Sequence, residues 1–270
     1  MSSPEQTVVI TGASGRIGRA VVPLLRRPGR MLRLVDTSPA EFEPGDDISW
    51  HDVSIEDAEG IEEVLDGASG LVHLAGLASE RPWADLLRVN IDGTHTVLEA
   101  ARRTGVDRVL LASSIHAVGF QPVAAAGAAV PPLPRPDTYY GVSKAAMEAL
   151  GSLYADRFGM SVVSARICAF TANAGDGRAT AQWLSPGDMA RLIEAGLALD
   201  DGAHHIVWGV SANAPGWFSL DAGFAIGYHP QDDARAVAIE RDGVEPPEPD
   251  ARAPLGGVFT DEQHPVGGTW

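Results

Sequence analysis

Apolar segments of strand length alternate with amphipathic segments of helical spacing through the first 210 residues of this chain. Near-continuous apolar strands between helices are typical of a parallel sheet covered by helices on both faces. We therefore expect an α/β fold with a doubly wound parallel sheet. The expected strands are 7–11, 31–36, 70–75, 109–113, 161–167 and 205–208, with a weaker one at 47–52. The expected helices are 17–25, 57–65, 83–104, 140–158 and 188–199, the last beginning at Ser185-Pro186-Gly187-Asp188.

Two segments depart from this alternation. Residues 121–137 are rich in alanine and proline, and proline continues neither a helix nor a central strand, so we expect a loop there. From Val210 onward glycine, proline and acidic residues dominate and the periodicity is lost. We expect this part to be irregular structure that folds over the active edge of the sheet as a small C-terminal cap.

Composition excludes several classes of partner. A formal net charge of −16 argues against nucleic acid or an anionic membrane. No apolar run approaches the roughly 18 residues that span a bilayer, and residues 1–5 lack the basic start of a signal peptide. The single cysteine, Cys168, cannot form an internal disulfide, which fits a reducing compartment. We expect a cytoplasmic protein that acts on a small molecule and forms a homo-oligomer.

The first expected strand runs into a glycine-rich turn, Gly12-Ala13-Ser14-Gly15-Arg16-Ile17-Gly18, and then into a helix. Glycines in such a unit let the backbone approach a pyrophosphate, which rests on the helix N-terminus. Asp36 ends the second expected strand, where a carboxylate binds the ribose hydroxyls of NAD and repels the 2′-phosphate of NADP. Arg16 and Arg33 favour NADP, but the carboxylate leads us to expect NAD on a Rossmann-type sheet. The alternative is a glycine turn that serves packing alone.

Lys144 is the only lysine of the chain, and the other nineteen Lys and Arg residues are arginines. Tyr140 lies four residues before it, a spacing that places both side chains on one face of a helix. A compact ammonium beside a phenol favours the phenolate and lowers the tyrosine pKa, as a general acid or base near neutral pH requires. A surface lysine beside a packed tyrosine is the alternative.

Ser113 and Ser114 lie at the carboxyl end of the strand expected at 109–113, the edge where ligands bind in open α/β sheets. Tyr140 follows Ser114 by 26 residues, which suits a return from strand to helix. Serine, tyrosine and lysine can then converge beside the cofactor. Ser114 would hold a substrate oxygen, Tyr140 would exchange its proton and Lys144 would bind the nicotinamide ribose.

These motifs resemble those of the extended short-chain dehydrogenase/reductase family over nearly the whole chain. The resemblance rests on the glycine turn, Asp36, Asp52-Val53, His73-Leu74-Ala75-Gly76, Asn90 in Val-Asn-Ile-Asp-Gly-Thr, Ser114 and Tyr140-x-x-x-Lys144. It implies adenine contacts at Asp52-Val53 and a structural part for Asn90 in a proton relay. The expected catalytic residues are then Ser114, Tyr140, Lys144 and Asn90. The expected cofactor-binding residues are Gly12, Ser14, Gly15, Arg16, Ile17, Gly18, Asp36, Asp52, Val53, Leu74, Ala75, Gly76, Asn90, Tyr140, Lys144 and Ile167.

Within that family the chain most resembles the uronate dehydrogenases, which oxidise C1 of glucuronate or galacturonate with NAD to an aldarolactone. The resemblance includes Ser113-Ser114-x-His116-x-x-Gly119, Arg178 with Trp183 and Ser185, residues 207–213, and residues 256–259, which correspond to a C-terminal strand. Three positions depart from the pattern, because Ile115 replaces an asparagine and Ala78 and Ala169 replace serines. Lost polar contacts indicate a less polar or differently oriented substrate. The expected substrate-binding residues are Ala78, Ser79, Ser114, Ile115, His116, Tyr140, Ala169 and Arg178, the last suited to a carboxylate.

We therefore expect an NAD-dependent dehydrogenase of the uronate type, with no metal site. The alternatives are a divergent dehydrogenase or epimerase with a less polar secondary-metabolite or sugar substrate, and a non-catalytic NAD-sensing protein. The domain is expected to be single, over residues 1–270. Its NAD-binding core would comprise about 5–167 and the strand 204–209, and its substrate side about 168–203 and 210–270. The substrate itself and the direction of the reaction are left open.

Overall fold

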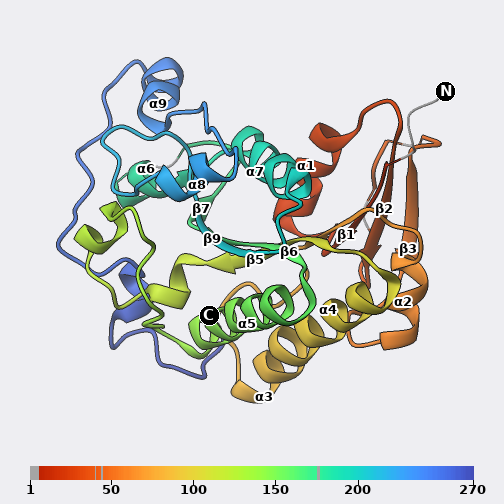
Figure 1. Ribbon diagram of the computed structural model, residues 1–270. Helices are drawn as coiled ribbons and strands as arrows, with labels where there is room; N and C mark the ends of the chain where they lie inside the picture. Colours follow the sequence, from red (N-terminus) through yellow and green to blue (C-terminus); the bar gives the residue numbers. More distant parts are fainter. Residues whose placement is uncertain (1–5, 40, 44, 175–176) are drawn as a thin grey trace.

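A seven-stranded parallel sheet forms the centre of the computed structural model, which describes residues 6–39, 41–43, 45–174 and 177–270 (Figure 1). The strand order is β3-β2-β1-β4-β5-β6-β9. The strands are β1 (Gln6–Thr11), β2 (Arg30–Asp36), β3 (Ile48–Asp52), β4 (Gly70–His73), β5 (Arg108–Ser114), β6 (Ser161–Ile167) and β9 (His204–Gly209). The α/β fold and all seven expected strands are confirmed. The expected start of the core at residue 5 lies outside the described residues.

The sheet changes its direction of winding at β1. This strand pairs in parallel with β2 on one side and with β4 on the other. The chain therefore adds β2 and β3 on one side of β1, and β4 and the later strands on the other side. At such a switch point the loops that follow the two strands separate and leave a crevice at the carboxyl ends. The fold therefore places its ligand site between the loops after β1, β2 and β4.

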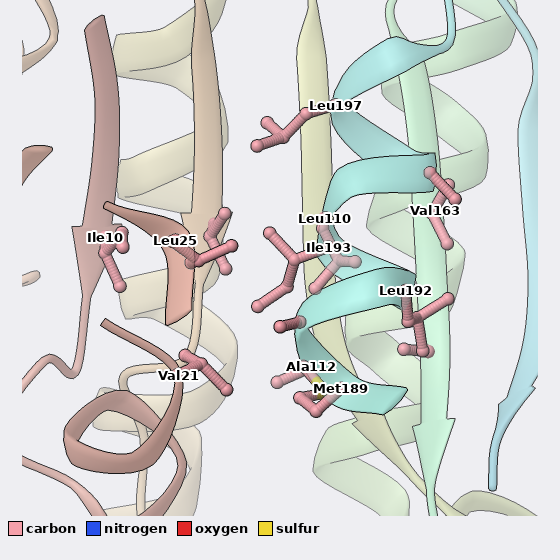
Figure 2. Packing of buried hydrophobic residues seen from close by; sticks show 14 of the residues in the cluster. Ile10, Val21, Leu25, Leu110, Ala112, Val163, Met189, Leu192, Ile193 and Leu197 are labelled. Carbon is pink, nitrogen blue, oxygen red and sulfur yellow. The ribbon is translucent and has the colours of Figure 1, made fainter. Parts of the chain in front are cut away.

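Helices cover both faces of the sheet (Figure 1). On one face lie α1 (Arg16–Leu25) and α7 (Pro186–Ala198), and on the other α2 (Ala58–Leu65), α4 (Gly93–Thr104) and α5 (Tyr139–Phe158). Leu192 and Ile193 of α7 and Leu25 of α1 pack against Leu110 of β5 and its neighbours, and all four are almost completely buried (Figure 2). Each such side chain contributes about 1.5 to 3 kcal/mol by leaving water. The apolar strands and helix faces of the sequence thus form one core on each side of the sheet.

Polar side chains determine where the helices begin. Asp57 caps α2, Thr138 caps α5 and Ser185 caps α7, each by accepting a hydrogen bond from a first-turn N–H. The expected start of the last helix at Ser185 is confirmed. Thr138 matters most for function, because the helix that it starts carries Tyr140 as its second residue.

The single helix expected at 83–104 is wrong in detail. The structure divides it into α3 (Trp83–Leu86), a π-helical turn η1 (Leu87–Asp92) and α4. A π turn widens the helix by one residue, and such turns often occur at functional sites. Asn90 lies in this turn and is buried. A helical period of apolar residues continues across such a turn, so the sequence pattern does not reveal it.

The loop expected at 121–137 is confirmed except for a short 3₁₀ turn. That turn is η3 (Val123–Gly127), and another 3₁₀ turn, η2 (Ile115–Val118), comes before the loop. After β6 come β7 (Ala169–Phe170), α6 (Arg178–Gln182) and β8 (Trp183–Leu184), with β7 and β8 paired in parallel. These elements follow the carboxyl end of β6 and so lie on the ligand side of the sheet.

The expectation of irregular structure after Val210 is wrong in part. The segment contains α8 (Asp221–Ala225), α9 (Ala234–Asp242) and the 3₁₀ turn η4 (Gly257–Thr260). In α9 only Ala234 and Ala238 are buried, and two small residues give too weak an apolar stripe to mark a helix in the sequence. Residues 256–259, expected to match a strand, instead comprise Gly256, which precedes the η4 turn, and the first three residues of that turn.

Candidate active site

The glycine turn joins β1 to α1 at a close approach to the loop after β4. Gly12 has a φ of +72°, and a Cβ placed there would lie 2.5 Å from the Ala75 nitrogen. A Cβ at Gly18 would lie 2.4 Å from the Ala13 oxygen. Only glycine fits at both positions. The helix begins at Gly15 without a side-chain cap, so its first N–H groups form a cradle that suits a phosphate.

Asp36 is held at the end of β2 by two backbone groups. Its carboxylate accepts hydrogen bonds from Ser14 N and Ser38 N, both at 3.0 Å. Arg33 is directed elsewhere, since its Nη1 donates to the Val64 and Asp66 carbonyls at 2.7 and 2.6 Å. Arg33 therefore does not favour a 2′-phosphate beside Asp36.

A cavity of about 490 Å³ extends along these loops. Eleven of the expected site residues line it: Gly12, Gly15, Arg16, Ile17, Gly18, Asp36, Val53, Leu74, Ala75, Gly76 and Ala78. Sequence reasoning missed Val35, Thr37, Ser38, Ser54, Ile55, Glu56, Leu77, Arg88 and Val89. Most of these lie within a few residues of the carboxyl ends of β2, β3 and β4, and that position is the signal that could have found them. Six expected cofactor-binding residues are not part of the lining: Ser14, Asp52, Asn90, Tyr140, Lys144 and Ile167. Of these, Ile167 lies 8 % exposed in the core.

Asn90 connects the loop after β4 to the helix α5. Its Oδ1 accepts from Leu77 N at 2.8 Å, and its Nδ2 donates to the Leu77 carbonyl at 3.0 Å and to the Ser143 hydroxyl at 2.9 Å. Gly76 lies directly beside it, with its Cβ position 3.0 Å from Asn90 Oδ1 and 3.9 Å from Lys144 Nζ. Lys144 is therefore a neighbour of Gly76, which lines the cavity.

Ser114, Tyr140 and Lys144 come together at the carboxyl end of β5, and all three are buried. The Tyr140 phenol is hydrogen-bonded to Ser114. Lys144 Nζ lies 5.7 Å from the centre of the Tyr140 ring and donates to the Ala112 carbonyl at 2.7 Å. Lys144 is thus a buried side chain of the site and not a surface lysine.

Burial changes the pKa of both ionisable groups. It raises the pKa of Tyr140 to about 12, because the phenolate loses water; the hydrogen bond with Ser114 opposes this rise and Asp137 adds to it. It lowers the pKa of Lys144 to about 8, because the ammonium loses water. The net change for Tyr140 is opposite to the lowering expected from Lys144, since desolvation of the phenol outweighs the charges around it.

His116 is placed beside Tyr140 by an acidic partner. Its Nδ1 lies 2.7 Å from Asp137 Oδ2, and its ring meets the Tyr140 ring edge-on at 5.7 Å. Phe259 stacks on the other side of the imidazole with 3.8 Å between ring centres. Sequence reasoning missed Asp137 and Phe259, although Asp137 comes three residues before Tyr140.

The other expected substrate residues take different positions. Ala78 is exposed and lines the cavity, while Ser79 donates to the Trp270 carbonyl at 2.6 Å. Ala169 is half-buried and pairs with Trp183 in the small β7–β8 sheet. Ile115 is buried in an apolar cluster with Trp208 and other side chains. Only Ala78 of the three departing positions therefore lies on the cavity.

Arg178 donates hydrogen bonds to backbone carbonyls of residues 250–255. Its Nη1 lies 2.6 Å from the Asp250 oxygen, and its Nη2 lies 2.7 Å from the Pro254 oxygen. The guanidinium also stacks over Trp217 at 4.9 Å. The structure thus shows this arginine joined to a segment that lies far along the chain, and its part in substrate binding stays a prediction.

Two kinds of feature are absent from the residues that the structure describes. No group of three or more His, Cys, Asp or Glu side chains there could hold a metal ion. None of the helices in that part of the chain is long and apolar enough to cross a membrane.

The fold and the site together define a class of protein. A doubly wound parallel sheet, a glycine turn with a carboxylate after β2, and a buried Ser–Tyr–Lys group after β5 are the arrangement of an extended short-chain dehydrogenase/reductase. The model of the NAD dependent epimerase/dehydratase family matches residues 8–184, and the chain belongs to this family.

Several known proteins resemble the chain over most of its length. It is 34% identical to a uronate dehydrogenase of Pseudomonas syringae pv. tomato over 259 residues, which cover 95% of this chain and 94% of that protein. It is 32% identical to an L-arabinose 1-dehydrogenase (NAD(P)(+)) of Haloferax volcanii over 259 residues, covering 85% of this chain and 98% of the relative. A solved mutant uronate dehydrogenase from Agrobacterium tumefaciens, in complex with NAD, matches with a TM-score of 0.84 and 32% identity over 97% of this chain and 99% of that one. The expected resemblance to uronate dehydrogenases is confirmed.

Proposed function

We propose that this protein is an NAD-dependent dehydrogenase that oxidises the C1 hydroxyl of a sugar acid to an aldarolactone. The observation that carries the proposal is the buried group of Ser114, Tyr140 and Lys144, whose lysine lies beside Gly76 of the cavity lining. The 34% identity to a uronate dehydrogenase over 95% of the chain supports the sugar-acid class.

The residues of the cavity fit NAD. The N–H groups at the start of α1 and the Arg16 side chain suit the pyrophosphate, and Asp36 suits the adenosine ribose hydroxyls. Val53 would contact the adenine, and Lys144 would bind the nicotinamide ribose. When bound, NAD supplies the acceptor for the hydride that leaves C1.

Tyr140 removes the proton of the C1 hydroxyl, and Ser114 holds the same oxygen by a hydrogen bond. A phenol with a pKa of about 12 is a poor acid at neutral pH, so the site must stabilise the phenolate during the reaction. Lys144, whose pKa of about 8 leaves it protonated at neutral pH, and Arg16 supply positive charge for this purpose. Asn90 holds Leu77 and Ser143 in place and belongs to the same proton relay.

The remaining expected residues surround the sugar in this proposal. His116 and Ser79 offer polar contacts, Ala78 reduces the polarity of the cavity, and Arg178 binds the carboxylate. Ile115 and Ala169 act on the sugar only through the residues that they pack against. Binding through Arg178 requires that it release at least one carbonyl of residues 250–255.

The test is incubation of the protein with NAD and D-glucuronate or D-galacturonate, following the absorbance of the reduced cofactor. Turnover supports the proposal, and no turnover with either sugar contradicts the uronate assignment. The Tyr140→Phe variant is expected to lose about 10²- to 10⁴-fold in kcat while it binds NAD as the wild type does. An unchanged kcat contradicts the role given to Tyr140.

A neutral aldose is the second candidate substrate, and the position of Arg178 favours it. Both Nη atoms of this arginine already donate hydrogen bonds to backbone carbonyls. A substrate without a carboxylate would leave these bonds intact. The similarity to an L-arabinose 1-dehydrogenase supports the same class. A higher kcat/KM for L-arabinose than for D-glucuronate in the same assay supports the neutral substrate, and the reverse result supports the uronate.

We further propose that residues 1–270 form one domain, with residues 168–203 and 210–270 on the substrate side. We also propose a homo-oligomer in the cytoplasm. Light scattering of the purified protein tests the assembly, and a monomer at all concentrations contradicts it.

A further inference from the structure

Glu80 is a fully buried carboxylate in the loop after β4. Its Oε2 accepts from Tyr140 N at 2.7 Å, and its Oε1 accepts from Tyr139 N at 3.3 Å and from Gly267 N at 2.7 Å. All three donors are backbone groups, two at the start of α5 and one from a segment 187 residues further along the chain.

The bonds to α5 complete the cap of the helix that carries Tyr140. The first N–H groups of a helix have no partner within it, and a negative charge is favoured at that end. Thr138 accepts from Gly141 N, so Glu80 and Thr138 together satisfy the N–H groups of Tyr139, Tyr140 and Gly141. Because Glu80 bonds to the backbone of Tyr140 itself, its position bears directly on where the phenol lies.

The third bond reaches residues 256–270, which we call the covering segment. Phe259 of this segment stacks on His116, and Trp270 packs edge-on against Phe259 at 4.5 Å. Ser79 and Arg81, the neighbours of Glu80 in the chain, both donate to the Trp270 carbonyl. Three successive residues of one loop thus hold the covering segment beside His116 and the start of α5. In Figure 1 the end of the chain accordingly lies beside α5.

We propose that Glu80 is a positioning residue of the active site, which fixes the first turn of α5 under Tyr140 and joins the docking of the covering segment to that position. The inference rests on the proposed function for its effect on turnover. Its structural part, that one carboxylate orders two distant segments together, does not depend on the substrate.

The Glu80→Gln variant tests the structural part by hydrogen–deuterium exchange of the full-length protein. A glutamine has the same shape but only one accepting oxygen, so it cannot satisfy both Tyr140 N and Gly267 N. We expect faster exchange of the amides at 139–141 and at 266–268 together. Asp188→Asn is the matched control, because Asp188 is also fully buried and accepts from two backbone N–H groups, Gln231 N and Asp232 N, far from Tyr140. It should leave exchange at both segments unchanged.

Kinetics of the same variants test the effect on catalysis. We expect kcat per folded Glu80→Gln molecule to fall about 10- to 100-fold, because small misplacement of a reacting group has effects of this size, with NAD affinity unchanged. A residue that contributes stability alone lowers the folded fraction but not kcat per folded molecule, and Asp188→Asn should behave in that way.

A second pair of variants covers the case in which Glu80→Gln does not fold. Tyr139 is the first residue of α5, where proline is tolerated, so Tyr139→Pro removes one donor to Glu80 and keeps the helix. Tyr139→Ala loses the same ring but keeps the N–H. We expect faster exchange of the covering segment and a lower kcat for Tyr139→Pro than for Tyr139→Ala.

Equal exchange at both segments in Glu80→Gln and wild type overturns the proposal, as does equal behaviour of the two Tyr139 variants. An unchanged kcat in folded Glu80→Gln overturns its catalytic part. Failure of the wild type to oxidise any uronate or aldose contradicts the proposed function alone, since the exchange results do not require turnover.

Discussion

Lys144 should make the stability of the protein depend on pH in a direction that is unusual for a lysine. Burial lowers the pKa of this side chain from 10.5 to about 8. At pH values between these two numbers, the unfolded chain holds the proton while the folded protein does not. Stability therefore rises with pH through this range, because the state that binds more protons is the unfolded one.

The size of the effect follows from the two pKa values. A tenfold change in proton affinity corresponds to about 1.4 kcal/mol, so the change from 10.5 to about 8 corresponds to about 3 kcal/mol. Below pH 8 the full cost of burying the ammonium is present, and above pH 10.5 it is gone. Lys144→Met keeps the length of the side chain without a charge and removes the dependence.

The assay is urea unfolding of the wild type and Lys144→Met at a series of pH values from about 7 to about 11. At low pH we expect the variant to have the higher free energy of unfolding. This difference from the wild type should shrink by about 3 kcal/mol between the lowest and the highest pH. Because the raised pKa of Tyr140 lowers stability above pH 10, the comparison is repeated in the Tyr140→Phe background. The free energies of unfolding with Lys144 and with Met at position 144 would then be plotted against pH in each background. If the two curves run parallel in both backgrounds, Lys144 is not buried as an ammonium.

Three further changes have expected outcomes of their own. Asp36→Ser should lower the affinity for NAD about tenfold or more, since at least one hydrogen bond to a charged group is lost. It should also reduce the ratio of the affinity for NAD to that for NADP. An unchanged ratio in a fluorescence titration speaks against the role of Asp36. Asn90→Ala removes three buried hydrogen bonds and should lower the free energy of unfolding by about 3 kcal/mol, whereas a loss below about 1 kcal/mol contradicts the arrangement described. Leu110→Ala should cost about 2 to 5 kcal/mol in urea unfolding and leave NAD affinity unchanged, because the side chain is fully buried in the core away from the cavity.

The strands of the sheet were predictable because they follow from local patterns. Most of the strands contain short apolar runs, and the glycine turn at Gly12 marks the end of β1, the strand at which the sheet changes direction. The π turn around Asn90 was not predictable, since one extra residue in a helix leaves the apolar spacing nearly unchanged. Helix α9 was missed because only two alanines face inward.

Residues of the site were predictable where they lie next to a strand or a helix start. The sequence places Asp36, Ser114 and Tyr140 at such positions, and the structure finds Asp36 on the cavity and the other two in contact. The partners of Glu80 and Arg178 lie far away in the chain, at Gly267 and at residues 250–255. Contacts of this kind depend on the folding of an irregular segment, and no local pattern encodes them. The rise in the pKa of Tyr140 was not predicted for a similar reason, because the sequence does not show how deeply the phenol is buried.

Residues 250–270 are attached to the rest of the protein mainly through their main chain. Arg178 donates to carbonyls of Asp250 and Pro254, Ser79 to that of Trp270, and Glu80 accepts from the N–H of Gly267. A main-chain anchor is present whatever side chain the residue carries. Selection can therefore exchange side chains such as Phe259, which faces His116, without detaching the segment, so that new substrate preferences can evolve on an unchanged frame.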